Sequence, residues 1–391
     1  MKDSLLLLLT PNNSLEKWNA RGQLSRELSF YDDFCRSAGL KLIIYSYGRN
    51  DRRFLKDHPH FELLQMFPWI PRNIPFKLQN LIYYGASLVL YRKYFRRALI
   101  SKTNQFRSAR FGLLLKWFYR IPLVVRMGFY HSHFKKLSRM ARLEEQLTFR
   151  TADRILTTSF EAGGFIEKTY GISRDKILCM CNAIDLKVFR PEEAETAKDY
   201  DAVFVGRLEE LKNIRLMLDA FRDTELRFLL IGDGALRSLV RATAEESPNI
   251  TWKDRVDNIE LPRYLNRSRC FMLLSTHEGN PKALLEAMAC GLPSIVSRVP
   301  GIRECIQDDV TGWFTGMNAA EIREKVRRLV ADERKAGEMG QSASRWVRAQ
   351  SDFRINIQKE IAFYQPYLQS GRTRRISSEA ASLPAPTKAS A

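Results

Sequence analysis

Long apolar runs are missing from this sequence of 391 residues. No run approaches the roughly 20 apolar residues that a transmembrane helix needs, so the sequence predicts no membrane span. The apolar run at residues 5–9 is short, and polar residues follow it without a small-residue cleavage site. This pattern favours a buried first strand over a signal peptide.

Cysteine pairs with metal or redox spacing are also missing. No two of the six cysteines are separated by two residues, as in zinc or redox motifs, and several lie inside apolar runs, where cysteine acts as a small hydrophobe. We therefore expect a reducing, cytoplasmic compartment and no structural metal. The cysteines are Cys35, Cys179, Cys181, Cys270, Cys290 and Cys305.

Carboxylates are absent over one long stretch. No Asp or Glu occurs between Glu62 and Glu144, whereas sixteen Lys or Arg do. Residues 1–150 hold 27 basic and 10 acidic side chains, so almost all of the net charge of +19 lies in the first half. The sequence therefore predicts a basic surface on the N-terminal part of the protein.

What the sequence does contain is a repeated alternation of β-rich apolar runs and helical patterns. This alternation is typical of parallel sheets built from βαβ units. We therefore expect an α/β protein with two Rossmann-like, doubly wound domains, which also suits the chain length. Strands are predicted at residues 5–10, 40–47, 61–66, 98–101, 122–128, 154–159, 176–180, 201–206, 227–232, 250–253, 271–275 and 294–297.

A linker between the two domains is predicted at residues 189–199, where Pro191 precedes a polar run. The expected N-terminal domain spans residues 1–190 and the C-terminal domain residues 191–350. Residues 351–368 are predicted to form a helix that crosses back to the first domain. Residues 369–391 are poor in apolar side chains, so we expect a disordered tail.

The strongest site pattern lies at residues 271–293, which read FMLLSTHEGNPKALLEAMACGLP. An apolar strand, a polar turn and a helix follow one another, which is typical of an anion site at a helix N-terminus. Pro281 suits the first helical turn. Glu278 in the turn and Glu286 in the helix are placed to reach different parts of one elongated ligand.

A second group of candidate residues follows the predicted strand at 201–206. Arg207 and Lys212 are two cations beside one strand end, an arrangement that suits a diphosphate. Gly232 and Gly234 follow the next strand, where the backbone must turn sharply or approach a ligand.

Together these segments resemble the retaining GT-B glycosyltransferases of family 4. The similarity is sharpest from about residue 151 to residue 315. It includes the run NAIDLKVFRP at residues 182–191, with Ala183 where the family usually has Gly, and two glutamates with seven residues between them.

The resemblance implies a nucleotide-sugar donor site without a metal or other cofactor. Arg207 and Lys212 would neutralise the departing diphosphate, Glu278 would hold sugar hydroxyls and Glu286 would bind the ribose. Fixed cations there lower the barrier because the leaving group gains negative charge in the transition state. The backbone of the turn would approach the sugar or phosphate at Gly279, Asn280 and Pro281.

Ordinary structural interpretations stand beside these assignments. Glu286 alone also suits a solvated helix residue, and Lys212 alone suits a surface cation. A glycosidase fits poorly, because its two carboxyls must flank one bond on opposite faces.

In the first half the resemblance is incomplete. Gly22 suits the family's flexible loop that faces the cleft, and equally suits an ordinary turn. Met127 occupies the position before Gly128 where the family often has a histidine that contacts the donor sugar. Arg126 or a nearby histidine, His131 or His133, are candidate replacements.

The basic stretch at residues 72–142 interleaves cation pairs with aromatic side chains. This composition suits an anionic membrane surface, and hence a lipid-linked acceptor. Nucleic acid would attract the same charges, but the sequence holds no nucleic-acid-binding motif.

The sequence therefore predicts a cytoplasmic glycosyltransferase, peripherally bound to the membrane, that builds a cell-surface polysaccharide such as O-antigen, capsule or exopolysaccharide on a lipid-linked or other glycan acceptor. The alternatives are a catalytically inactive sugar-nucleotide-binding protein and a basic nucleic-acid-binding protein.

Overall fold

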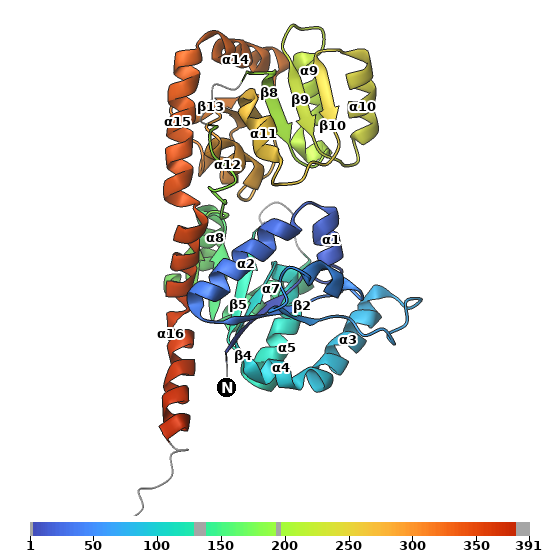
Figure 1. Ribbon diagram of the computed structural model, residues 1–391, viewed down its shortest axis with the longest axis vertical. Helices are drawn as coiled ribbons and strands as arrows, with labels where there is room; N and C mark the ends of the chain where they lie inside the picture. The colour runs from blue at the N-terminus through green and yellow to red at the C-terminus, as the bar shows by residue number, and fades with distance from the viewer. Residues whose placement is uncertain (1–2, 129–137, 193–196, 381–391) are drawn as a thin grey trace, which may run out of the picture.

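The computed structural model describes residues 3–128, 138–192 and 197–380, with backbone alone for 370–380. Two α/β domains lie one above the other, and the last two helices run alongside them, the first of these beside the second domain and the last beside the first domain (Figure 1). Each domain contains one parallel sheet, with strand order β3-β2-β1-β4-β5-β6-β7 in the first and β10-β9-β8-β11-β12-β13 in the second. The predicted fold class, two doubly wound Rossmann-like domains, is confirmed.

In the first domain the central strands are buried along their whole length, because helices cover both faces of the sheet. The strands are β1 (Ser4–Leu8), β2 (Lys41–Tyr45), β3 (Glu62–Leu64), β4 (Ala98–Thr103), β5 (Leu123–Met127), β6 (Arg154–Thr157) and β7 (Ile177–Cys179). The helices are α1 (Leu15–Ala20), α2 (Leu24–Ala38), η1 (Asp51–Leu55), α3 (Phe76–Leu90), α4 (Arg92–Arg97), η2 (Phe106–Ser108), α5 (Ala109–Tyr119), α7 (Arg139–Thr151), α8 (Phe160–Tyr170) and η3 (Arg174–Lys176).

The second domain repeats the arrangement with a shorter sheet and one continuous core. Its strands are β8 (Tyr200–Val205), β9 (Phe228–Ile231), β10 (Ile250–Lys253), β11 (Ser268–Leu273), β12 (Ser294–Ser297) and β13 (Gly312–Thr315). Its helices are η4 (Glu210–Lys212), α9 (Ile214–Phe221), α10 (Arg237–Glu246), α11 (Leu261–Asn266), α12 (Lys282–Ala289), α13 (Pro300–Arg303), α14 (Ala319–Ala331) and α15 (Glu333–Gln350).

The strand order reverses direction between β1 and β4 in the first sheet and between β8 and β11 in the second. In open parallel sheets, ligands bind outside the carboxyl ends of the strands at such a switch point. The segments that follow β8 and β11 carry Arg207, Lys212 and Glu278, so the predicted donor residues lie at the switch point of the second sheet.

The predicted strands agree with the structure apart from their ends, with one omission. All twelve overlap an observed strand, but β13 was not predicted. This strand has only four residues, and although Trp313, Phe314 and Thr315 favour strands, so short a run does not distinguish a strand from a loop.

The last helix, α16 (Phe353–Ala380), returns from the second domain to the first, as expected. It packs against α2 and β4, and the backbone amide of Ile184 bonds to Ser351 O at 2.7 Å where the chain crosses between domains. The sequence predicts a disordered tail from residue 369, whereas the backbone of residues 369–380 continues this helix. Arg, Glu and Ala in this segment have adequate helix propensity. Residues 381–391 lie outside the described part.

Candidate active site

The cation and carboxylate predicted to share the donor site are in direct contact. Lys212 Nζ donates a hydrogen bond to Glu278 Oε1, and Ser275 Oγ donates to the same oxygen at 2.6 Å. The two charged side chains are only 14% and 10% exposed. The alternative, that Lys212 is a solvated surface cation, is therefore wrong. The Glu278 carboxylate holds it at the switch point.

Glu286 lies on α12, facing the first domain. It is 4% exposed, and its Oε1 accepts hydrogen bonds from Arg26 Nη1 and Asn258 Nδ2, both at 3.1 Å. The alternative of a solvated helix residue is therefore wrong. No described residue donates a hydrogen bond to Oε2. One oxygen thus ties the two domains together while the other is available to a hydroxyl group.

Arg207 differs from the other predicted donor residues in being exposed. Its side chain is 71% exposed and pairs with Glu209. It follows β8 at the switch point, within the same connection as Lys212. Its contact with a diphosphate stays a prediction.

The turn between β11 and α12, residues 274–281, is called the donor turn below. Asn280 is 6% exposed, and its side-chain oxygen accepts from the backbone amide of Asn182 at 2.7 Å. Asn182 Nδ2 donates to the carbonyl of Asn280, also at 2.7 Å. Pro281 is the N-cap of α12 rather than its first residue. The two asparagines therefore fasten the donor turn to the first domain.

Glycines allow the close packing around this turn. A Cβ on Gly301 would lie 1.9 Å from the carbonyl oxygen of Gly279, so only glycine fits there. Gly22 has a φ of +63°, which favours glycine, and its Cβ position would lie 3.8 Å from the carbonyl oxygen of Val256. Gly22 thus occupies a tight turn that faces the second domain, and its role at a donor stays a prediction.

Arg126 and Met127 lie on opposite sides of the end of β5, because side chains alternate along a strand. Met127 lines a cavity together with Glu278 and Gly279 of the donor turn. Arg126 lines a different cavity. This placement favours a separate role for Arg126 over replacement of the expected histidine. His131 and His133 fall outside the described residues, so the prediction for His131 stays untested.

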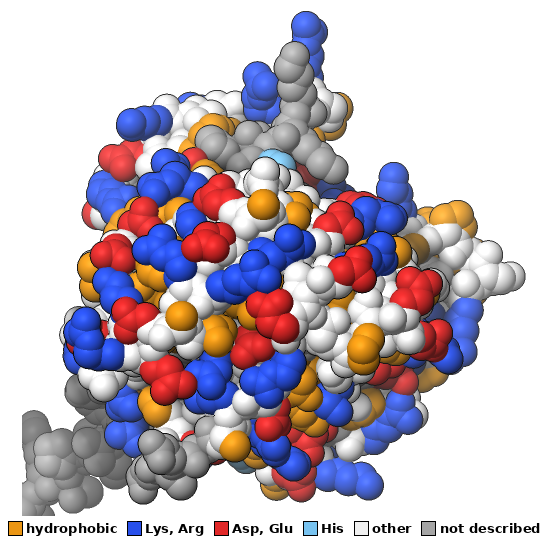
Figure 2. All heavy atoms as spheres, turned by 90° about the horizontal axis from the view of Figure 1, so that it is seen from above, with side chains coloured by type: hydrophobic (Ala, Val, Ile, Leu, Met, Phe, Trp, Pro, Cys, Tyr) orange, Lys and Arg blue, Asp and Glu red, His pale blue; other side chains and the backbone are white. Residues whose placement is uncertain are grey.

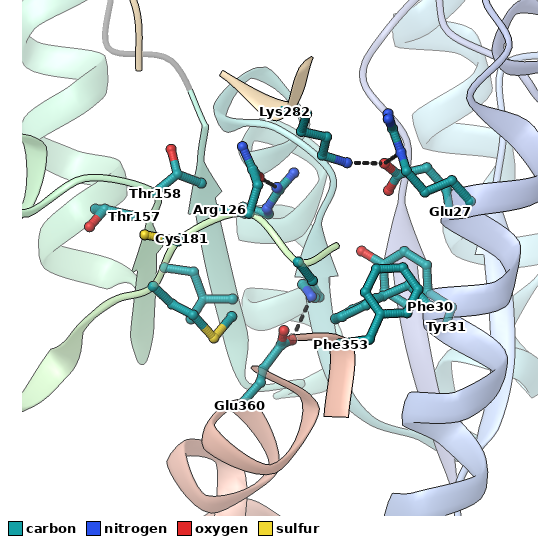
Figure 3. A pocket seen from close by; sticks show the side chains of 16 residues that line it. Glu27, Phe30, Tyr31, Arg126, Thr157, Thr158, Cys181, Lys282, Phe353 and Glu360 are labelled. Atoms are coloured by element: carbon teal, nitrogen blue, oxygen red, sulfur yellow. Dashed lines mark hydrogen bonds and ion pairs between the residues drawn. The ribbon is translucent and has the colours of Figure 1, made fainter. Parts of the chain in front are cut away.

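The cavity beside Arg126 contains charged residues that sequence reasoning missed. Figure 3 shows Lys282 of α12 directed at Glu27 of α2, with Arg126 between them and β6. Lys282 Nζ lies 2.8 Å from Glu27 Oε1, so this ion pair also joins the two domains. Burial and the charge of Arg26 lower the pKa of Lys282 to about 8 despite Glu27. Burial alone would raise the pKa of Glu27, but Lys282, Arg26 and Arg126 lower it to about 2.

Another ion pair lines this cavity. Lys102 Nζ of β4 lies 2.5 Å from Glu360 Oε1 of α16, and the two side chains are 2% and 1% exposed. Tyr364 Oη donates to the same carboxylate at 2.7 Å. The pair anchors α16 to the first sheet beneath the cavity (Figure 3).

The described residues contain one group of three side chains that could bind a metal ion, and this group lies outside the cavities at the domain boundary. Ligand atoms of Asp32, His58 and His60 lie within 4.8 Å of one another. Asp32 already pairs with Arg36 and His60. None of these residues lines the cavities beside the donor turn.

Comparison with known families finds a similarity in the second domain. Residues 187–346 match the family model described as "Glycosyl transferases group 1". This part of the chain is therefore similar to the group 1 glycosyl transferases. The match contains Arg207, Lys212, Glu278 and Glu286, so all four predicted donor side chains lie within the matched residues.

Curated relatives match part of the chain. The chain is 28% identical over 209 residues to the putative colanic acid biosynthesis glycosyltransferase WcaL of Escherichia coli, covering 48% of this chain and 49% of that protein. It is 28% identical over 212 residues to N-acetyl-alpha-D-glucosaminyl L-malate synthase of Bacillus anthracis, covering 50% and 55%. The chain therefore spans about half the length of these two relatives.

Solved structures match the whole architecture. HepE of Anabaena, in complex with UDP-glucose, superposes with a TM-score of 0.71 at 17% identity, covering 93% of this chain and 98% of that one. Sucrose-phosphate synthase of Thermosynechococcus elongatus superposes with a TM-score of 0.72 at 20% identity, covering 96% and 100%. The two-domain fold is therefore GT-B.

The surface charge differs between the two domains. Figure 2 looks onto the second domain and shows basic and acidic side chains intermixed over this face. Residues 151–391 contain 36 basic and 34 acidic side chains, which explains the mixture. The excess of positive charge lies in residues 1–150, with 27 basic and 10 acidic side chains.

Proposed function

We propose that this protein is a retaining family 4 glycosyltransferase that moves a sugar from a nucleotide diphosphate sugar to an acceptor hydroxyl. The carrying observation is the contact between Lys212 and Glu278 at the switch point of a domain similar to the group 1 glycosyl transferases, with Glu286 buried nearby. Both carboxylates are held by neighbouring side chains, so their positions are set before a donor arrives.

In the proposed reaction, the bond between the sugar C1 and the diphosphate oxygen breaks, and the acceptor oxygen bonds to C1 on the same face. The acceptor proton passes to the departing diphosphate. Lys212 and Arg207 would stabilise the charge that develops on this leaving group. Lys212 would then exchange its contact with Glu278 for the diphosphate, leaving Glu278 to sugar hydroxyls and Glu286 Oε2 to the ribose.

Domain closure would exclude water from this reaction. Arg26, Glu27 and Asn182 of the first domain contact Glu286, Lys282 and Asn280 of the second. These contacts support a closed arrangement in which donor and acceptor meet between the domains. No metal or other cofactor is needed in this scheme, because protein cations face the leaving group.

Polysaccharide synthesis on a lipid-linked or other glycan acceptor is the proposed context. The relative WcaL is named as a putative colanic acid biosynthesis glycosyltransferase, which supports this class of product.

We further propose that the first domain has a membrane-facing surface, with a lipid-linked acceptor and a peripheral location at the inner face of the cytoplasmic membrane. No helix in the described part of the chain is both long and apolar enough to span a bilayer. Several large apolar side chains are nevertheless exposed on α3, α5 and α7, among Lys and Arg residues of the same helices. They include Leu81 (67%), Val89 (63%), Trp117 (59%), Phe118 (68%), Met140 (76%) and Leu143 (60%). Apolar anchors next to cations suit an anionic lipid surface.

Flotation with vesicles tests this membrane proposal. We expect the protein to float with anionic vesicles at low salt and not with zwitterionic vesicles, and Leu81→Ser with Val89→Ser to weaken flotation. Ile259→Ser, which changes an equally exposed apolar residue (72%) on the second domain, is the matched control. Absence of flotation at low salt would remove the membrane from the proposal.

The glycosyltransferase proposal is tested with a panel of nucleotide sugars. A donor that binds the folded state raises the unfolding temperature, and slow donor hydrolysis reports turnover without a known acceptor. Stabilisation without any turnover would favour the inactive sugar-nucleotide-binding protein. Tight, salt-sensitive binding to an oligonucleotide, with no response to nucleotide sugars, would favour the nucleic-acid-binding alternative.

A further inference from the structure

The cavity beside Arg126 contains more positive than negative charge. Four cations and two carboxylates line it: Arg26, Lys102, Arg126, Lys282, Glu27 and Glu360. Lys102 and Glu360 pair with each other, and Arg26 also contacts Glu286. When this pair is set aside and Glu286 is included, three cations remain: Arg26, Arg126 and Lys282. Only two carboxylates, Glu27 and Glu286, balance them, so one positive charge at the cavity is not neutralised.

Arg126 carries this unmatched charge. Its guanidinium donates to Asn182 Oδ1 at 2.8 Å and to Asn104 O at 3.3 Å, which are both neutral acceptors. No carboxylate among the described residues lies within ion-pair distance of it. A guanidinium offers five N–H donors, so most of those on Arg126 are still available to a ligand.

Arg26 adds a second available donor. Its Nε is buried and makes no hydrogen bond with a described residue, although it lies 3.8 Å from Glu27 Oε1 and the same side chain lies at the cavity wall. The Arg26 side chain is 13% exposed. A buried N–H without an acceptor is costly, so a ligand oxygen in the cavity would relieve that cost.

The size and position of the cavity suit a small anionic group. Its free volume of about 50 Å³ corresponds to a few water molecules, which a phosphate or carboxylate group can replace. Asn182 joins Arg126 to Asn280 of the donor turn through hydrogen bonds of 2.8 and 2.7 Å. A group bound at Arg126 would therefore be connected to the predicted donor site through a single residue, Asn182.

We infer that this cavity is an anion subsite in which Arg126, Lys282 and Arg26 Nε bind a phosphate or carboxylate group carried by the sugar acceptor. The inference rests on the proposed function for the acceptor, but the binding of an anion stands on the cavity itself. Glu27 keeps Lys282 in place, and Lys282 reaches the anion from the second domain while Arg126 reaches it from the first. Anion binding would thus favour the closed arrangement of the two domains.

Inorganic phosphate is the first probe, applied to the full chain at constant ionic strength. We expect phosphate to raise the unfolding temperature of the wild type, and Arg126→Gln and Lys282→Gln each to weaken phosphate binding about tenfold or more. Arg107→Gln changes an exposed arginine of the same domain and should leave phosphate binding unchanged. Circular dichroism shows whether each cavity variant folds. If one of them does not fold, the other still tests the subsite.

The predicted diphosphate site must be separated from this cavity. Arg207→Gln should retain the phosphate response if the anion binds at Arg126. Loss of the response in Arg207→Gln alone, or no response in the wild type, would overturn the subsite. Nucleotide-sugar binding by the wild type is measured separately, so failure of the donor proposal is distinguishable from failure of this one.

A sugar phosphate tests which molecule carries the anion. Glucose 6-phosphate should bind more tightly than inorganic phosphate, and glucose should not bind measurably, if the anion belongs to a sugar acceptor. Equal affinity for glucose 6-phosphate and inorganic phosphate would overturn the assignment to the acceptor and leave a free anion as the ligand.

Discussion

Removal of the Glu360 carboxylate should strongly destabilise the first domain. In Glu360→Met, Lys102 would keep its burial, 2% exposed, but lose the oxygen 2.5 Å from its ammonium group. Removing one partner of a buried ion pair costs about 3–5 kcal/mol, because the remaining charge is uncompensated. Contacts of Lys102 with the rings of Phe30 and Tyr31, at 5.4 and 5.0 Å, replace only part of the lost attraction.

The double variant Lys102→Met with Glu360→Met tests whether the cost is one of charge. Both charges are then absent, so stability should return to within about 1 kcal/mol of the wild type. Urea unfolding followed by circular dichroism measures the free energy of the first transition. Glu338→Met is the control, because Glu338 is 58% exposed and its pair with Arg334 contributes little.

The sign of the pH dependence gives a second check. Burial lowers the pKa of Lys102 even beside Glu360, and loss of that carboxylate would lower it further. Between the lowered pKa of Lys102 and the ordinary lysine pKa, the unfolded chain then binds more protons than the folded one, so the stability of Glu360→Met should rise with pH across this window. A cost below about 1 kcal/mol, or a double variant no more stable than the single one, would refute this reasoning.

Three further predictions concern the site. Gly301→Ala should abolish donor binding in a thermal-shift assay, because its Cβ would lie 1.9 Å from a carbonyl oxygen of the donor turn; unchanged binding would show that the turn is not required. Arg26→Gln should weaken nucleotide-sugar binding about tenfold in calorimetry, since Glu286 loses a charge-assisted hydrogen bond of 3.1 Å; equal affinity would detach Arg26 from the donor site. Phosphate binding should weaken as the pH rises through about 8, where Lys282 loses its charge, and a flat titration between pH 7 and 9 would exclude Lys282 as a ligand.

The sequence was most informative where function depends on local order along the chain. Lys212 and Glu278 follow strand ends of one domain, so the pattern of strand, turn and helix predicted that they lie close together, and their side chains are in contact. The burial of Glu286 was not predictable from spacing alone, since an exposed glutamate on a helix has the same sequence pattern.

Residues from opposite domains were not predictable in this way. Arg26 and Glu286 are 260 residues apart, and Glu27 and Lys282 are 255 apart. Neither pair leaves a periodic or short-range signal, because only the packing of one domain on the other brings its members together. The one available signal was the position of Arg26 and Glu27 shortly after Gly22, at the start of a helix beside the expected cleft.

The strand end at Arg126 and Met127 illustrates a finer limit. The sequence predicted that Met127 occupies the position where the family often has a histidine, but it offered Arg126 as a replacement for that histidine. Adjacent side chains of a strand point to opposite sides, so the two residues face different cavities. Met127 lines the cavity of Glu278, whereas Arg126 lines that of Glu27 and Lys282.

Donor turnover tests the central claim most directly. Hydrolysis of nucleotide sugars is measured for the wild type, Glu278→Ala and Lys212→Ala, with Arg215→Ala as a control because Arg215 is a 58% exposed cation three residues beyond Lys212. The account predicts turnover of at least one donor by the wild type and the control, and a loss of about 10²-fold or more in each site variant. Undiminished turnover in both site variants would contradict the assignment of the donor site.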